Sequence, residues 1–342
     1  EDDIRSPPTP ASEARETPPP AMNDNVRTHY NALAGYTSYD LQWLGPILYP
    51  LTFACIAQAL VFTDIALSSQ GRRFLPQPKW LIRNISKPAS PIRMDSRINM
   101  VASIIMLSEV VFAACCIVQC ALNYRHREFV GTSNACDVQA AYATYYVFSA
   151  IGLAAYGIIV GWRVIAAGDG GALFQARRLL AAGILIHVVA LFIALLPLFG
   201  VDGWMFATDY CMFNIEAPLY CALFLFFFGG SVIVSVIALY NASVAVASAS
   251  MDTAGPKRDA FKLLLATSGY LFAAWVTTLI IAFLWLANGA VFNSTEWRIY
   301  GAQAIILHSN QLFTPLLFGW LWRHAMQAIL VSSDASSSLA KP

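Results

Sequence analysis

Ionisable side chains within long apolar stretches are the first candidates for chemistry in this sequence. Glu109 lies in the stretch NMVASIIMLSEVVFA, where a carboxyl group must be protonated, paired or hydrated. His187 and His308 occur singly in two other apolar stretches, and Asn310 and Gln311 give the second of these a polar face that can meet Glu109. Such a carboxyl group indicates a functional site, with a structural hydrogen bond between helices as the alternative.

The same residues do not form a pattern typical of metal or catalytic chemistry. A zinc hydrolase needs clustered His and carboxylate ligands. His187 and His308 lie in separate stretches, and neither has a second His three or four residues away. We therefore expect no catalytic residue, no metal and no cofactor, and we do not expect an enzyme.

The elements that hold these side chains are long apolar segments. Apolar residues make up 58% of the chain and charged residues 12%, against about 25% in a typical soluble domain. A bilayer core about 30 Å thick needs about 20 helical residues. Seven segments are long enough: 44–67, 98–122, 138–166, 179–199, 217–240, 261–287 and 299–322. The sequence predicts an all-α fold, a bundle of seven transmembrane helices spanning 44–322.

The two ends of the chain differ from this central domain. Residues 1–43 are rich in Pro, Glu and Thr and bury too little apolar area to fold, so we expect a disordered extracellular tail. Residues 323–342 are expected to form a short amphipathic helix and a cytoplasmic tail. In that helix Met326, Ile329 and Leu330 are expected to face lipid.

Loop charges predict the orientation. With the N-terminus outside and the C-terminus in the cytoplasm, the inner segments hold 15 Lys and Arg and the outer segments 6. This topology places Asn293, in the sequon Asn293-Ser294-Thr295, outside as a candidate glycosylation site. Seven basic residues between 68 and 97 would attract anionic membrane lipids. No basic patch with interleaved aromatics indicates nucleic acid. A multi-pass protein of the plasma membrane is expected.

Two of the seven cysteines fall at the outer boundary, where disulfide bonds persist. Cys136 begins the third apolar segment and Cys211 lies between the fourth and fifth. A bond between them would pin that loop over the mouth of the bundle. Cys120, at the outer end of the second segment, is a competing partner. The others are expected to behave as small apolar residues within the spans.

These residues resemble motifs of the rhodopsin-like superfamily of G-protein-coupled receptors, or of a divergent lineage beside it such as the cAMP-receptor-like group. Asn99 and Glu109 match an Asn and an acidic residue ten positions apart in helix two. Cys136 and Cys211 match the pair that the family joins by a disulfide. Asn310 and the segment Thr314-Pro315-Leu316-Leu317-Phe318 match the helix-seven pattern, with Thr and Phe substituted.

Other positions depart from the family. The inner end of helix three reads Val160-Gly161-Trp162-Arg163 in place of Asp-Arg-Tyr, so Arg163 is out of register. Helix six keeps Trp275 but lacks the family's Pro. A retinal Schiff base needs a Lys in helix seven, and residues 299–322 contain none. His308 stands at that position by the family's spacing.

The resemblance implies a cell-surface receptor that binds an unknown extracellular ligand and activates a heterotrimeric G protein. The residues that it implies for ligand binding are Gln139, Tyr142, Tyr146, Trp275 and His308. It implies an intramembrane polar core of Glu109 and Asn310 and a hinge at Pro315 and Phe318. Arg163 is the residue expected to face the G protein. The alternative is a transporter coupled to protons or cations through Glu109.

Overall fold

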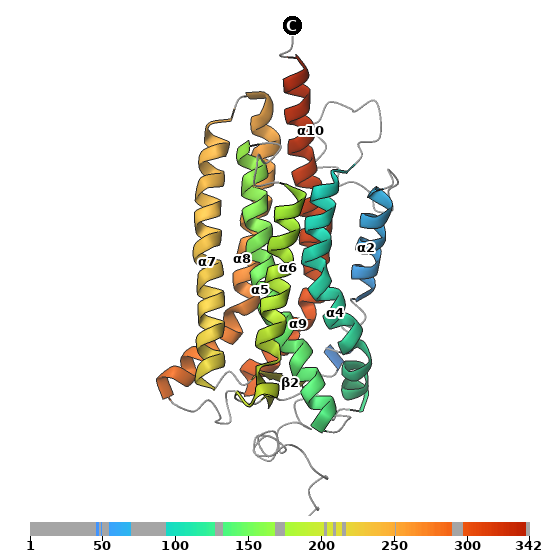
Figure 1. Cartoon of the computed structure of the whole chain (residues 1–342), viewed down its shortest axis with the longest axis vertical. Helices are drawn as coiled ribbons and strands as arrows, with labels where there is room; N and C mark the ends of the chain where they lie inside the picture. Colours follow the sequence, from blue (N-terminus) through green and yellow to red (C-terminus); the bar gives the residue numbers. More distant parts are fainter. Residues whose placement is uncertain are drawn as a thin grey trace, which may run out of the picture.

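The computed structural model of the chain describes residues 46–47, 49, 55–69, 94–126, 133–167, 175–201, 204–207, 210–213, 217–249, 251–288 and 297–339. Within these ranges the protein is a bundle of long, roughly aligned helices (Figure 1). The predicted tail 1–43, most of the basic loop 68–97, and Asn293 lie outside the described residues.

The helices follow the predicted order of seven spans. They are α2 (Cys55–Ser69), α4 (Ser96–His126), α5 (Ser133–Ala167), α6 (Ala176–Ala194), α7 (Pro218–Ala247), α8 (Met251–Asn288) and α9 (Trp297–Thr314), the last continued by η4 (Pro315–Trp322) and α10 (Arg323–Leu339). Five of them, α4 to α8, are long and apolar enough to cross a bilayer. The described part of α2 is a shorter apolar helix. The predicted all-α, seven-helix fold is confirmed.

Helix α5 lies at the centre of the bundle and packs against α4, α6, α7 and α8. Glycines on α5 allow close packing, as small residues do between membrane helices. A Cβ added to Gly157 would lie 2.8 Å from the ring of Phe318, and one added to Gly161 would lie 2.8 Å from Leu264. The centre of the fold is therefore tight, and large side chains on α8 and η4 fill the space that these glycines leave.

Gly183 on α6 tests how tightly the bundle packs. An added Cβ would lie 2.5 Å from Cγ2 of Ile104 on α4. We expect Gly183→Ala to lower the free energy of unfolding by about 1–3 kcal/mol, as overpacking does. Gly269→Ala is the matched control, because nothing lies within 4 Å of its added Cβ and alanine favours a helix. Thermal unfolding of both variants in detergent makes the comparison, and equal melting temperatures would contradict the close α4–α6 contact.

A β-hairpin covers one end of the bundle. Strands β1 (Trp204–Ala207) and β2 (Tyr210–Phe213) pair antiparallel, with Trp204 opposite Phe213. In Figure 1 the hairpin lies at the end opposite the C-terminus. Phe213 is buried, and its ring lies 5.5 Å from that of Phe148 on α5. The loop between the fourth and fifth spans thus folds back onto the helices.

The seventh span changes geometry at Pro315. Residues 315–322 form π-helical turns between the α-helices α9 and α10. Proline has no N–H to bond to the carbonyl four residues earlier, which belongs to Gln311. That carbonyl instead accepts a hydrogen bond from the Nε2 of Gln58 on α2, at 3.5 Å. The seventh span therefore departs locally from α-helical geometry after Pro315, and the role of Pro315 as a hinge stays a prediction.

The amphipathic helix after the seventh span is present as α10, but its expected lipid-facing direction is wrong. Met326, Ile329 and Leu330 are all buried, and α10 packs on α8. The Oε1 of Gln327 accepts a hydrogen bond from the backbone N–H of Asp95, at 2.7 Å. The apolar face of α10 therefore extends the bundle core instead of lying on a membrane surface.

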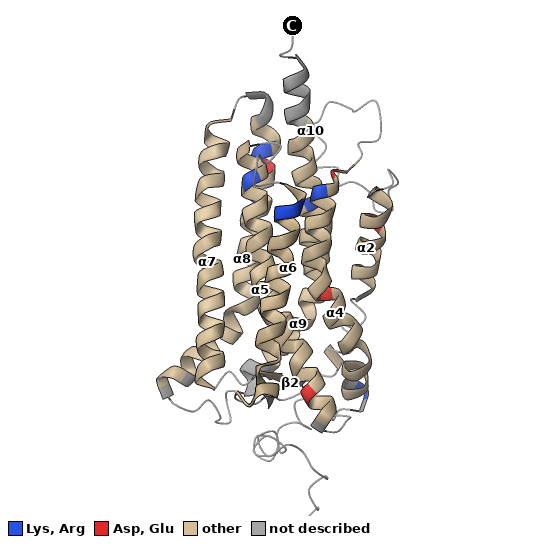
Figure 2. Ribbon diagram, in the orientation of Figure 1, with Lys and Arg blue, Asp and Glu red and all other residues tan. Residues whose placement is uncertain are grey.

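Among the residues that the structure describes, charged groups lie mainly toward one end of the bundle. Figure 2 shows most of the blue and red segments near the end from which α10 projects, with the middle of the bundle almost entirely uncharged. Large apolar side chains are exposed on the outside of the helices, among them Leu185, Phe192, Phe226 and Ile233. An exterior of this kind is stable in lipid and not in water. The chain is a multi-pass membrane protein.

Candidate functional site

Glu109 is buried in the interior of the bundle and links three other helices. The hydroxyl of Tyr146 on α5 donates a hydrogen bond to its Oε1 at 3.1 Å. The Nε2 of Gln311 on α9 donates to its Oε2 at 3.1 Å. The side-chain oxygen of Gln311 in turn accepts a hydrogen bond from Gln58 on α2. Residues from four helices thus meet around one carboxyl group.

Asn310 lies beside this group. Its Oδ1 accepts a hydrogen bond from the hydroxyl of Tyr270 on α8. A cavity of about 20 Å³ separates the two sets of polar groups, lined by Glu109, Tyr146, Tyr270, Asn310 and Thr314 among others. A cavity needs about 10–15 Å³ to hold one water. The structure therefore brings together Glu109 and Asn310, as predicted, around space for one water or one small ion.

No cationic side chain neutralises Glu109 within the described ranges. The ion pairs there are Arg97 with Asp95 and Arg323 with Asp64. A charged carboxylate in a bilayer core is costly unless it is paired. The site therefore suits either a protonated carboxyl group, which can donate a hydrogen bond, or a carboxylate with a bound cation.

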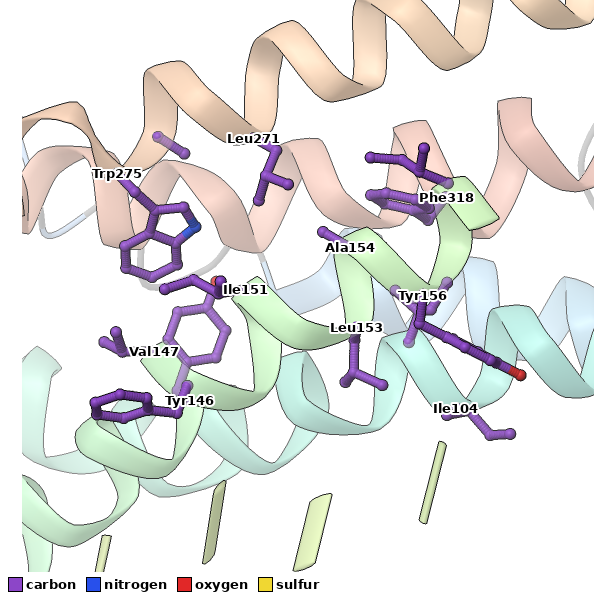
Figure 3. Close-up of a cluster of buried hydrophobic side chains, with 14 of the residues drawn as sticks. Ile104, Tyr146, Val147, Ile151, Leu153, Ala154, Tyr156, Leu271, Trp275 and Phe318 are labelled. Carbon is purple, nitrogen blue, oxygen red and sulfur yellow. The ribbon is translucent and has the colours of Figure 1, made fainter. Parts of the chain in front are cut away.

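Four of the five predicted ligand contacts lie close together, and three of them surround Phe112 of α4. The ring centroid of Phe112 is 4.4 Å from that of Tyr146, 5.7 Å from that of Tyr142 and 6.1 Å from that of His308. Tyr146 and Trp275 lie across from each other between α5 and α8 (Figure 3), with centroids 6.5 Å apart. The side chains fill this region closely, and a bound ligand would have to separate them.

Gln139, the fifth predicted contact, holds the hairpin. Its Oε1 accepts a hydrogen bond from the backbone N–H of Cys211, at 2.8 Å. The predicted disulfide between Cys136 and Cys211 is present. Both cysteines are fully buried. The start of α5 is therefore joined to β2 by a covalent bond and by a hydrogen bond three residues along the helix.

A second buried polar cluster, at the end of the bundle near α10, was not predicted. Arg323 and Asp64 form a buried ion pair between α10 and α2. The Nη1 of Arg323 also donates to the Oγ of Ser68 at 3.3 Å and to the Oδ1 of Asn99 at 3.4 Å. An Asp in an apolar span together with an Arg at the end of another is the signal that could have indicated the pair.

A third cluster also escaped sequence analysis. Cys116 and Cys120 on α4 form a disulfide, so neither is a free apolar residue, and Cys120 does not compete for Cys136 or Cys211. The Nε2 of His308 lies 3.5 Å from the Sγ of Cys116. The four-residue spacing of the two cysteines, which places them on one helix face, was the available signal.

Two predicted residues remain, Arg163 and Phe318. Arg163 is near the end of α5, with its guanidinium group 4.0 Å from the ring centroid of Trp162. Phe318 is buried in η4. That Arg163 faces a G protein and that Phe318 belongs to a hinge both stay predictions.

Comparison with known proteins reveals the fold. No model of a known family matches the chain, and no curated protein sequence matches it. Among solved structures, the crystal structure of squid rhodopsin matches with a TM-score of 0.57 at 13% sequence identity, over 87% of this chain and 88% of that one. The chain therefore has the seven-helix rhodopsin fold.

Proposed function

We propose that this protein is a receptor that binds an extracellular ligand and activates a heterotrimeric G protein. The observation that carries the proposal is the buried polar core of Glu109, Tyr146, Gln311 and Asn310 within a bundle of the rhodopsin fold. Helices that share such a core cannot rearrange singly, because each buried polar group needs its partners. A ligand that favours one arrangement would therefore shift the whole bundle.

In this proposal the ligand binds beside the hairpin and contacts Tyr142, Tyr146, Trp275 and His308, with Gln139 fixing the hairpin above them. Trp275 and Tyr146 transmit its presence to Glu109. The other end of the bundle, where Arg163 lies, meets the G protein. The N-terminus is outside, the C-terminus is cytoplasmic, Asn293 is glycosylated, and the protein resides in the plasma membrane among lipids that contact its apolar exterior.

The polar core gives the test. We expect Glu109→Gln to change basal or ligand-driven nucleotide exchange on a G protein by several-fold while the protein still folds. The amide keeps the shape and can still accept a hydrogen bond from Tyr146, but unlike a carboxyl group it cannot ionise. Exchange measured on purified protein with a panel of G proteins, beside the thermal unfolding temperature, separates the two effects. Loss of folding alone would make Glu109 structural.

A transporter is the second candidate, favoured by one observation. Glu109 faces a cavity of about 20 Å³ and has no described cationic partner, as a proton or cation site requires. Proteoliposomes distinguish the two functions. Solute uptake driven by a proton or sodium gradient and lost in Glu109→Gln supports transport, whereas nucleotide exchange without uptake supports the receptor.

A further inference from the structure

Cys116, Cys120 and His308 form a compact cluster at the contact between α4 and α9. All three side chains are buried, and one ligand atom from each lies within 4.8 Å of the other two. The Cα atoms of the two cysteines are 5.3 Å apart and their sulfurs are bonded to each other. Two cysteine sulfurs and one imidazole nitrogen are a set of donors that zinc and other thiophilic metal ions prefer.

The imidazole of His308 is oriented as in a metal ligand. Its Nδ1 lies 2.8 Å from the backbone oxygen of Ala304. A carbonyl oxygen can only accept, so Nδ1 carries the proton and Nε2 presents a lone pair. This Nε2 is the atom that lies 3.5 Å from the Sγ of Cys116. Metal-binding histidines are commonly fixed by such a hydrogen bond from the nitrogen that does not bind the metal.

We propose that, when the Cys116–Cys120 bond is reduced, these three residues bind a zinc ion. With Zn–S of about 2.3 Å and Zn–N of about 2.0 Å, tetrahedral geometry puts a sulfur and a nitrogen ligand about 3.5 Å apart. The observed separation of Cys116 Sγ and His308 Nε2 has this value. Only the second sulfur must move, by rotation of the Cys120 side chain once the bond to Cys116 is gone.

Charge selects the ion. Two thiolates and one neutral imidazole carry a charge of −2, which Zn²⁺ cancels, and a neutral complex avoids the cost of burying a net charge in the protein interior. No fourth His, Cys, Asp or Glu joins the cluster in the part of the chain that the structure describes. Zinc with three protein ligands takes a water or a small ligand in its fourth position. The site is thus of the open kind.

The redox step is a thiol–disulfide exchange. An external dithiol attacks the Cys116–Cys120 bond and is itself oxidised to a cyclic disulfide. The dithiol gives up two electrons and two protons, which convert Cys116 and Cys120 into two thiols. Binding of Zn²⁺ then releases those two protons to solvent. The bonded and the metal-bound forms are therefore alternatives, and oxidation would expel the ion.

Cobalt binding to the full chain tests this site. The protein, purified in detergent, is reduced with a dithiol, freed of it by gel filtration, and titrated with Co²⁺. We expect one equivalent to give a thiolate-to-cobalt charge-transfer band with tetrahedral d–d bands, and one equivalent of Zn²⁺ to remove them. Without reduction, no band is expected. Maleimide labelling counts the free thiols and so shows whether the Cys116–Cys120 bond has been reduced. The absence of a band after reduction would overturn the proposal. A Cys116–Cys120 bond that the dithiol cannot reduce would also overturn it.

Matched variants assign the ligands. Cys116→Ala and Cys120→Ala should abolish the charge-transfer band, and His308→Ala should weaken Co²⁺ affinity at least tenfold. Cys115→Ala, on the same helix but at an exposed free thiol, should leave the titration unchanged. Size-exclusion profiles show which variants remain folded. A band that persists in both Cys116→Ala and Cys120→Ala overturns the assignment. The titration needs neither ligand nor G protein, so its result does not depend on the receptor function.

Discussion

Arg323→Met is expected to be among the most destabilising single substitutions in this protein. The guanidinium group is fully buried and forms an ion pair with Asp64, which is also buried. Removing one partner of a buried ion pair typically costs about 3–5 kcal/mol, because a charge then remains buried without compensation. The free energy of unfolding, or the melting temperature of the protein in detergent, should fall accordingly.

Two comparisons separate this effect from general damage. Arg97→Met removes the partly exposed pair with Asp95, and pairs near the surface contribute only about 0–1 kcal/mol. The double variant Asp64→Asn/Arg323→Met removes both charges and should recover much of the stability that Arg323→Met loses. If Arg323→Met and Arg97→Met unfold at the same temperature, the buried pair does not stabilise the junction of α2 and α10.

The features that sequence analysis predicted correctly depend on local properties of the chain. The number and order of the spans follow from the length of each apolar segment, because a bilayer accepts only helices of sufficient apolar length. The position of Glu109 within its span follows in the same way. Cys136 and Cys211 could be paired because the start of the third segment and the loop between the fourth and fifth lie on the same predicted side of the membrane.

The features that it missed depend on how helices rotate and shift against each other. Asp64 and Arg323 are 259 residues apart, and a single sequence does not specify which faces of α2 and α10 meet. The same is true of Cys116 and His308, which lie 192 residues apart on α4 and α9. Helix α10 illustrates a further ambiguity, because one apolar face can pack on lipid or on a neighbouring helix. Only the packing of α10 on α8 decides between them.

The Cys136–Cys211 disulfide should affect the protein as strongly as the buried ion pair. It closes a loop with a sequence separation of 75, for which chain entropy predicts a stabilisation of about 4.5 kcal/mol. We expect Cys136→Ser and Cys211→Ser each to reduce the amount of protein at the cell surface sharply, because unfolded protein is retained and degraded. Labelling of an epitope tag on intact cells, against total protein, measures this.

Cys221→Ser is the matched control, since Cys221 is buried in α7 but forms no disulfide within the described residues. It carries the same change of side chain without loss of a covalent bond, and it should reach the surface nearly as well as the wild type. The double variant Cys136→Ser/Cys211→Ser should resemble either single one, because each alone already breaks the bond. Wild-type surface levels of both single variants would show that the Gln139–Cys211 hydrogen bond and the buried Phe213 hold the hairpin without the disulfide.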